Sequence, residues 1–481
     1  MSLKKKAIAG TMWTTISSMF LALIQVLRLS ILTRFLERSD FGLVAIIVLV
    51  LGFTHIFADL GVSVSLFSRQ DVSKKEYSSL YWVSLILGIS IYCILFSLTP
   101  IIAGFYKMPQ LNALIPLMGI DLIITTAGRQ FRVFSQKQLQ FKKLAIIDIS
   151  CSFLSLGIAV WIAVCNGGVY SLILSTLSAS LMATILLVIT GLKTHPMTFY
   201  INVKEGREFY KIGIYQIGSE ILDYISSQLD ILIIGKIMSL NDLGIYNLVK
   251  QLALRIYNII IPIITSVAVP LLSTINDNSD ELSAKYIKMV RTVAFVNIPI
   301  YTIVAILAKE VLTILYGSAY TPYYSYLQIL CFWGAIIAVM SAASSIVIIR
   351  GRTDLGFKWT ILRILTNPVF VIVGSFWGFK GIVIGQATCA IFYFSLYWIF
   401  LIRKVLNNVS FTKYGSTCAY YLLVCSILFI FLFFAKTQLL DKANNIWINI
   451  FAILPIFGLL YFITNKKMVK ELIQLIITRK I

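Results

Sequence analysis

Polar side chains interrupt the most apolar stretches of this chain, at the spacing of a helix face. One set recurs at intervals of three, four or seven residues near the N-terminus: Thr11, Thr14, Ser18, Gln25 and Arg28. A second set follows a similar pattern: Gln216, Glu220, Asp223, Ser227 and Asp230. Residues at these intervals share one side of an α-helix. Because an arginine at a bilayer centre costs about 2.5–3.5 kcal/mol, we expect both faces to meet protein, water or substrate instead of lipid.

Three more cations lie inside apolar stretches, at Lys250, Arg255 and Arg363. Arg255 shares its helix face with the amide of Asn258. A guanidinium binds a phosphate through two parallel hydrogen bonds, and an ammonium binds it as a point charge. Together with Arg28, these cations predict a binding site for an anionic, phosphate-bearing substrate.

The acidic residues of the second stripe leave three chemistries open. Glu220, Asp223 and Asp230 could pair with the cations, hydrogen-bond sugar hydroxyls, or bind a coupling proton or sodium ion. Asp59 and Asp121 are weaker candidates, as helix caps or ion ligands.

Two specific ion pairs are predicted. Arg28 and Asp230 occupy equivalent positions of an internal repeat, so they could form a gate that parts during transport or a static pair that packs helices. Asp148 falls at nearly the same predicted depth as Arg363 and could pair with it. The sequence does not choose between a gate and a static pair.

Composition places these residues in a membrane protein. Of 481 residues, 59% are hydrophobic and 13% are charged, whereas a soluble domain is about 25% charged. Apolar runs of about 20 residues are typical of transmembrane helices. The seven cysteines show no CxxC spacing and the only histidines are His55 and His195. Neither a disulfide framework nor a histidine-based metal site is therefore expected.

The charge balance indicates a topology instead of a nucleic-acid partner. The formal net charge is +21, and most of the 41 lysines and arginines fall on the side that carries both termini. The positive-inside rule then places both termini in the cytosol. The N-terminal sequence MSLKKK precedes an apolar run that Gln25 and Arg28 interrupt, which favours a retained first helix over a signal peptide. Because the outer loops are short, no extramembrane catalytic domain is expected. Because the sequence has no GxxxxGK[ST] motif, a self-contained ATP motor is not expected either.

An all-α polytopic fold with fourteen transmembrane helices is predicted. The spans run near 8–35, 41–67, 77–106, 110–135, 143–165, 169–192, 209–236, 242–275, 284–316, 320–349, 357–377, 381–403, 414–436 and 445–465. Short matches relate the first six spans to the next six. Residues 34–43 (RFLERSDFGL) align with 236–245 (KIMSLNDLGI), and residues 139–142 (LQFK) align with 355–358 (LGFK). Since each unit has an even number of spans, the repeat is parallel.

The repeat predicts two six-helix lobes in a V shape around a central cleft, with two extra C-terminal helices. The expected divisions are an N-lobe at 1–192, a cytosolic linker at 193–208, a C-lobe at 209–403, the last two spans at 404–465 and a basic cytosolic tail at 466–481. A cleft between two such lobes is a usual place for a transport site.

Several stretches resemble polysaccharide-transporter proteins. They are residues 31–44 (ILTRFLERSDFGLV), 57–70 (FADLGVSVSLFSRQ), 241–246 (NDLGIY) and 315–317 (LYG). Over nearly its whole length the chain is similar to repeat-unit and O-antigen flippases of the multidrug/oligosaccharidyl-lipid/polysaccharide (MOP) exporter superfamily, in particular to colanic-acid and teichuronic-acid exporters. Because that family has few invariant motifs, the candidate site residues rest on the polar stripes and not on the resemblance.

The resemblance implies a multi-pass protein of the bacterial inner membrane. Such a protein moves an undecaprenyl-pyrophosphate-linked oligosaccharide from the cytosolic to the outer leaflet for surface polysaccharide, such as O-antigen or capsule. No cofactor is expected, apart from a coupling sodium ion or proton that could supply the free energy. The expected partners are this lipid-linked substrate, membrane lipids and polysaccharide polymerase or assembly proteins, with a monomer as the functional unit.

Three alternatives remain open at this point. A drug or cation antiporter of the same superfamily would share the lobes, but its pocket should be acidic and poor in cations. A lipid II flippase would share the spans and the basic cleft, and only the substrate would distinguish it. A membrane glycosyltransferase or polymerase would be an enzyme and would need a sizeable outer loop.

Overall fold

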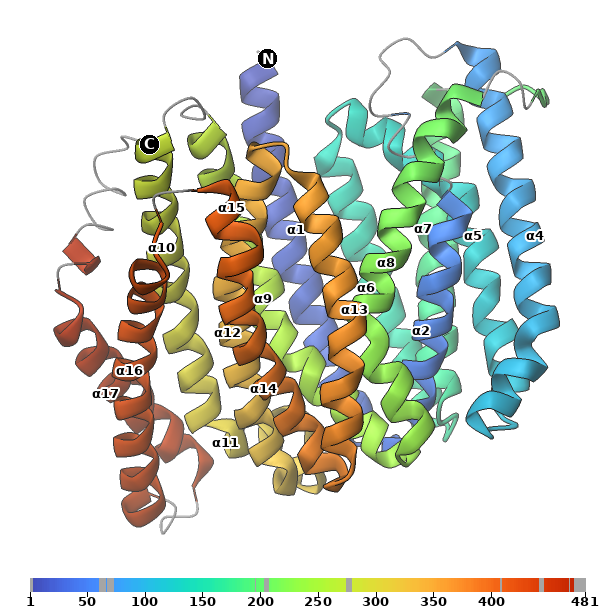
Figure 1. The fold of residues 1–481 in the computed structure, drawn as a ribbon. Coiled ribbons are helices and arrows are strands. Elements are labelled where there is room, and N and C mark those ends of the chain that lie inside the picture. The colour runs from blue at the N-terminus through green and yellow to red at the C-terminus, as the bar shows by residue number, and fades with distance from the viewer. Residues whose placement is uncertain are drawn as a thin grey trace. The chain divides into compact units, whose positions relative to one another are not determined.

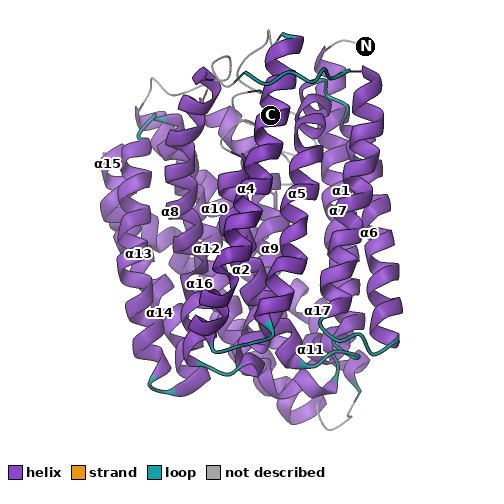
Figure 2. Ribbon diagram, turned by 90° about the vertical axis from the view of Figure 1, so that its right-hand side faces the viewer, coloured by secondary structure: helices purple, strands orange, loops and turns teal. Residues whose placement is uncertain are grey.

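The computed structural model is built of helices (Figures 1 and 2). It describes residues 3–59, 66, 73–194, 196–202, 207–273, 279–406, 409–440, 445–466 and 468–470. Regular structure in these ranges is helical throughout. Helices satisfy their backbone hydrogen bonds internally, which a bilayer demands of a spanning segment. The predicted all-α polytopic class is confirmed.

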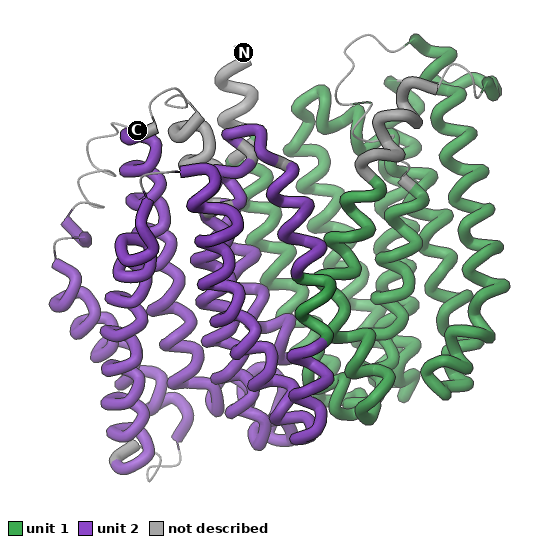
Figure 3. Tube along the Cα trace, viewed as in Figure 1, with its two compact units in different colours: residues 1–247, 363–368 green, residues 248–362, 369–481 purple. Residues whose placement is uncertain are grey.

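The chain divides into two compact units, which Figure 3 colours separately. Unit 1 comprises residues 1–247 and 363–368. Its helices are α1 (Leu3–Leu32), α2 (Arg38–Asp59), α4 (Lys74–Tyr106), α5 (Leu111–Lys137), α6 (Phe141–Val164), α7 (Tyr170–Thr194), α8 (Arg207–Ile237) and the start of α9 (Leu240–Ser273). Within this unit α5 packs against α4, α7 and α2, α6 packs against α1 and α7, and α8 packs against α2.

Unit 2 comprises residues 248–362 and 369–481. After the rest of α9 its elements are α10 (Ser279–Ile306), α11 (Ala308–Tyr316), η1 (Ser318–Tyr323), α12 (Tyr324–Ile349), α13 (Thr353–Ser375), α14 (Gly378–Tyr397), η2 (Trp398–Ile402), α15 (Arg403–Val405), α16 (Phe411–Ala435), η3 (Lys436–Leu440) and α17 (Ile446–Thr464). Helix α10 packs against α12 and α16, and α16 packs against α17. The predicted tail beyond residue 470 lies outside the described residues.

Twelve helices of the described chain are long and apolar enough to cross a membrane, against the fourteen spans predicted. The two predicted spans outside this count, 209–236 and 242–275, correspond to α8 and α9, which have 31 and 34 residues. Helix α8 carries the carboxylates of Glu220, Asp223 and Asp230, and charged side chains lower the apolar character by which spans are recognised. Helices α8 and α9 are therefore long enough to span a membrane, although they do not belong to the twelve that are also sufficiently apolar.

The division into units differs from the division into predicted lobes. The lobes rest on the sequence repeat, which separates the first six spans from the seventh in the linker at 193–208. The compact unit instead runs on to residue 247 and includes α8. The hydroxyl of Tyr224 on α8 donates to the carbonyl oxygen of Leu49 on α2 at 2.8 Å, and this packing explains why α8 groups with the preceding helices.

The predicted span at 284–316 is not one helix, because α10 ends at Ile306 and α11 begins at Ala308. The amide of Gln328 donates to the carbonyl oxygen of Ala305 at 3.0 Å. The Lys436 ammonium donates to the carbonyl oxygen of Ile306 at 3.1 Å. A break at membrane depth is tolerated where other groups satisfy the freed backbone. Side chains distant in sequence supply those bonds here, so the span pattern alone did not predict the break.

Two glycines at helix starts form a reciprocal backbone contact. A Cβ added to Gly42 would lie 2.2 Å from the carbonyl oxygen of Leu240, and one added to Gly244 would lie 2.0 Å from that of Arg38. In the sequence repeat Gly42 is equivalent to Gly244, and Arg38 to Leu240. The contact is thus the same from both sides, as a local twofold relation between the starts of α2 and α9 requires. Only glycine permits backbones to approach this closely.

Candidate functional site

Arg28 of α1 lies against two hydroxyl groups in unit 1. Its guanidinium donates to the Ser155 hydroxyl on α6 at 2.9 Å and to the Thr176 hydroxyl on α7 at 3.4 Å. Among the described residues these hydroxyls are its hydrogen-bond partners, and none of them neutralises its charge. Arg28 thus meets hydroxyl groups of α6 and α7, and its role in binding an anion stays a prediction.

Asp230 of α8 is bound elsewhere, so the predicted pair of Arg28 with Asp230 is wrong for this structure. Asp230 is buried, and it accepts hydrogen bonds from the Tyr246 hydroxyl and from the backbone N–H of Ile231. Tyr246 belongs to the start of α9. Two donors from neighbouring residues stabilise the buried carboxylate. Asp230 therefore ties α8 to α9 instead of closing a gate with Arg28.

The other residues of the two stripes are more open. Gln25, Glu220, Asp223 and Ser227 are exposed, whereas Asp230 at the end of the stripe is buried. The side chain of Gln216 lies outside the described part of the structure. The described part of the stripe on α8 thus runs from the exposed Glu220 to the buried Asp230.

The four predicted phosphate-binding cations are divided between the units. Arg28 and the half-buried Arg363 belong to unit 1, and the buried Lys250 and half-buried Arg255 belong to unit 2. Asn258, on the predicted face of Arg255, is exposed. A joint anion site of these four residues stays a prediction.

Asp148 of α6 has a partner that the sequence analysis did not consider. Arg132 on α5 forks onto both carboxylate oxygens: Nη1 donates to Oδ2 at 3.1 Å, and Nη2 donates to Oδ1. Helices α5 and α6 are consecutive and joined by three residues, so their facing ends meet directly. The structure pairs Asp148 with this neighbour instead of with the predicted Arg363.

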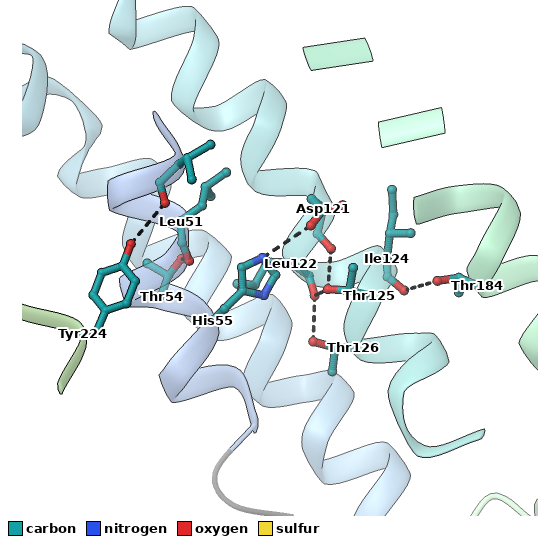
Figure 4. Close-up of polar contacts among 11 residues, drawn as sticks. Leu51, Thr54, His55, Asp121, Leu122, Ile124, Thr125, Thr126, Thr184 and Tyr224 are labelled. Carbon is teal, nitrogen blue, oxygen red and sulfur yellow. Dashed lines mark hydrogen bonds and ion pairs between the residues drawn. The ribbon is translucent and has the colours of Figure 1, made fainter. Parts of the chain in front are cut away.

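Sequence analysis also missed a pair formed by His55 on α2 and Asp121 on α5, shown in Figure 4. The His55 Nε2 and Asp121 Oδ2 atoms are 3.4 Å apart, with side chains 28% and 11% exposed. The sequence had offered a signal, because an aspartate inside a predicted span and one of only two histidines both stand out. That signal could not be used without knowing that α2 and α5 are neighbours.

Hydroxyl groups around this pair bind the backbone. Thr54 donates to the carbonyl oxygen of Leu51 at 2.8 Å, and Thr125 donates to that of Asp121 at 2.7 Å. On the far side of α5, Thr184 of α7 donates to the carbonyl oxygen of Ile124 at 2.9 Å (Figure 4). Within the described ranges, no three His, Cys, Asp or Glu side chains lie close enough to hold a metal ion.

Comparison with known families and curated proteins places this chain among proteins of polysaccharide biosynthesis. The family described as "Polysaccharide biosynthesis protein" matches residues 31–325. An uncharacterized membrane protein in the cps region of Klebsiella pneumoniae is 28% identical over 85% of this chain and 84% of its own length. The teichuronic acid biosynthesis protein TuaB of Bacillus subtilis is 28% identical, covering 74% of each chain. The lipopolysaccharide biosynthesis protein WzxC of Escherichia coli is 25% identical, over 85% of this chain and 83% of its own.

Solved structures share the fold at low identity. The lipid II flippase MurJ in an inward closed conformation gives a TM-score of 0.75 at 14% identity, covering 97% of this chain and 100% of that one. An inward-facing multidrug resistance MATE transporter of the MOP superfamily gives 0.59 at 16% identity, covering 82% and 100%. At these identities the likeness concerns the fold alone.

Proposed function

We propose that this chain, which belongs to the family of polysaccharide biosynthesis proteins and shares the fold of MurJ and of a MATE transporter, is a repeat-unit flippase and not an enzyme. Its substrate is an undecaprenyl-pyrophosphate-linked oligosaccharide, which it moves from the cytosolic to the outer leaflet of the bacterial plasma membrane. The names of TuaB and WzxC, which concern teichuronic acid and lipopolysaccharide, support a glycan destined for the cell surface.

The observation that carries this proposal is the environment of Arg28. An intramembrane arginine that pairs with a carboxylate has its charge compensated by that partner. Arg28 instead contacts the hydroxyls of Ser155 and Thr176, which position the guanidinium and leave its charge. A pyrophosphate is the part of the substrate that needs such a group, because guanidinium and phosphate form paired charge-assisted hydrogen bonds.

Transport proceeds by alternating access of the two lobes, 1–192 and 209–403. Arg28, Lys250, Arg255 and Arg363 contact the pyrophosphate, while the amides and carboxylates of the exposed stripes hydrogen-bond the sugars. These sugar-contacting residues are Gln25, Gln216, Glu220, Asp223 and Asn258. The lipid tail stays in the bilayer, and both termini are in the cytosol, as the bias of basic residues favours.

A lipid II flippase is the second candidate, since the likeness to MurJ spans nearly the whole chain. It requires the same contacts to the pyrophosphate, and it differs in the glycan attached. A cation antiporter of the MATE type is less well supported, because the proposed site is assigned four cationic residues and such a pocket should be poor in cations.

The test is to delete the gene, extract the membrane lipids and quantify pyrophosphate-linked oligosaccharide together with surface polysaccharide. We expect lipid-linked repeat units to accumulate and surface glycan to be lost. Complementation with Arg28→Ala should leave this phenotype, whereas Arg28→Lys, which keeps the charge, should restore part of the export. Accumulation of lipid II would support the second candidate, and unchanged lipids with new sensitivity to cationic drugs would overturn both.

A further inference from the structure

The His55–Asp121 pair is an ionisable pair within unit 1 that the proposed substrate contacts do not use. It joins α2 to α5, and its two facing atoms are 3.4 Å apart. Ionisable groups inside a membrane protein are costly and usually have a role in transport or proton transfer. Histidine is the side chain that gains or loses a proton most readily near neutral pH.

One oxygen of this pair has no hydrogen-bond partner among the described residues. Asp121 is 8% exposed, and its Oδ1 atom is buried without a hydrogen bond from any described residue. A buried carboxylate oxygen without a donor costs free energy, and the cost is greatest while the carboxylate carries an uncompensated charge. The charge on His55 therefore decides how costly it is to seal this region from water.

The surroundings suit a proton better than a metal cation. Sodium, like other hard cations, is held by several oxygen ligands. The pair offers one carboxylate, and within the described residues no three His, Cys, Asp or Glu side chains lie close enough to hold a metal ion. An imidazole is a nitrogen ligand, which a hard cation does not prefer.

We propose that the His55–Asp121 pair binds the proton whose inward movement drives outward transport of the substrate. The imidazole takes up one proton from the outer side, and the imidazolium and carboxylate then have no net charge. After the proton leaves to the cytosol, the pair carries a charge of minus one. The neutral pair can be sealed between helices at lower cost than the charged one, so closure depends on the proton. This inference rests on the proposed function as a transporter.

The other ionisable groups that the described contacts place on the packed helices are phenols or lie further along a helix. Tyr92 of α4 packs against Gly119, and Tyr224 of α8 binds the backbone of α2; a phenol is a much weaker acid than an imidazolium. Asp59 follows His55 by one turn of α2. Arg129 and Arg132 lie about two and three turns along α5 from Asp121, and Arg132 is bound to Asp148 of α6. No titratable group of α7 is placed against the pair by a described contact.

The experiment uses everted membrane vesicles in which respiration builds a pH gradient that a fluorescent dye reports. Vesicles from cells that make the lipid-linked repeat units are compared with vesicles from cells that lack the first glycosyltransferase. The wild-type protein should dissipate the gradient in a substrate-dependent way, with or without sodium in the medium. His55→Gln and Asp121→Asn should reduce that rate at least tenfold at equal membrane abundance, and Asp121→Glu should retain part of it.

Matched controls exist in the chain. His195→Gln removes the other imidazole, and Asp354→Asn removes a carboxylate from an exposed pair with Arg352; both should keep the wild-type rate. Full substrate-dependent dissipation by His55→Gln and Asp121→Asn, a requirement for sodium, or no dissipation by the wild type would each overturn the proton site. The lipids of the deletion strain separate the two proposals. If repeat units accumulate there, the flippase stands whatever becomes of the proton site, and if they do not, both fail.

Discussion

Two carboxylates inside helical regions of the protein differ in how completely their oxygens are hydrogen-bonded. Glu310 of α11 in unit 2 has both oxygens bound, one by the Lys436 ammonium at 2.6 Å and one by the Asn449 amide at 2.7 Å. Asp121 in unit 1 has one oxygen near His55, and its other oxygen has no hydrogen-bond partner in the part of the chain that the structure describes. The side chains of Lys436 and Glu310 are each 2% exposed, while those of His55 and Asp121 are 28% and 11% exposed.

The difference distinguishes buried charges that stabilise the fold from buried charges that can bind and release a proton. The Glu310 cluster, made of Glu310, Lys436 and Asn449, joins α11 to η3 and α17 and also satisfies the freed carbonyl oxygen of Ile306. Each of these groups needs the others, so the cluster cannot change its charge without loss of stability. The His55–Asp121 pair is incompletely satisfied and partly accessible, which are the properties a proton-binding group requires.

The largest expected effect is on the Glu310 cluster. Lys436→Met leaves the Glu310 carboxylate buried without its counter-charge, and the free energy of unfolding in detergent should fall by about 3–5 kcal/mol. The double variant Lys436→Met with Glu310→Leu should recover part of that loss, because no uncompensated charge remains. If Lys436→Met is as stable as the wild type, the Glu310 cluster does not stabilise the fold. The contrast with the His55–Asp121 pair would then be contradicted.

The close backbone contact between Gly42 and Gly244 involves no charge, and it gives a second reference value for the loss of stability. Gly42→Ala and Gly244→Ala each place a methyl group against a backbone carbonyl oxygen at about 2 Å, and each should lower the free energy of unfolding by about 1–3 kcal/mol. The matched control is Gly104→Ala on α4, where nothing lies within 4 Å of the added Cβ. That variant should be neutral or slightly stabilising, since alanine favours a helix over glycine. Equal effects at all three positions would contradict the close approach of the two helix starts.

The pair of Arg132 with Asp148 should lie between the two extremes. It is bidentate, but its side chains are 37% and 23% exposed, and solvent screens such a pair. We expect Arg132→Ala to lower the free energy of unfolding by about 1 kcal/mol, well below the effect of Lys436→Met. The same unfolding measurement in detergent tests this value. If Arg132→Ala lowers the free energy of unfolding as much as Lys436→Met, solvent exposure does not predict how much each ion pair stabilises the protein.

The smallest effect on stability is expected for His55→Gln. Glutamine keeps an amide that can donate to the Asp121 carboxylate, so the free energy of unfolding should fall by less than about 1 kcal/mol, well below the loss for Lys436→Met, while the proton-driven function is lost. Unfolding in detergent and dissipation of the pH gradient should both be measured on His55→Gln, since together they separate a structural pair from a proton-binding pair. If His55→Gln proves as destabilising as Lys436→Met, the pair is structural, as the Glu310 cluster is.

The sequence was informative wherever the physics is local. Apolar runs of sufficient length and their basic flanks predicted an all-α membrane protein, because a spanning helix satisfies its own backbone. Helical spacing predicted that Arg28 would meet polar groups, and the repeat placed Gly42 and Gly244 at equivalent positions. The resemblance to polysaccharide transporters pointed to the family that the matched residues 31–325 show.

The tertiary structure alone decided which charges meet. Arg28 lies with Ser155 and Thr176, Asp230 with Tyr246, and Asp148 with Arg132. It also decided the break after α10 and the meeting of His55 with Asp121. Spacing along a chain tells which side chains share a helix face, but it does not tell which helix packs against that face. The partner of an intramembrane charge belongs to that packing, because it comes from a helix distant in sequence and nothing local specifies it.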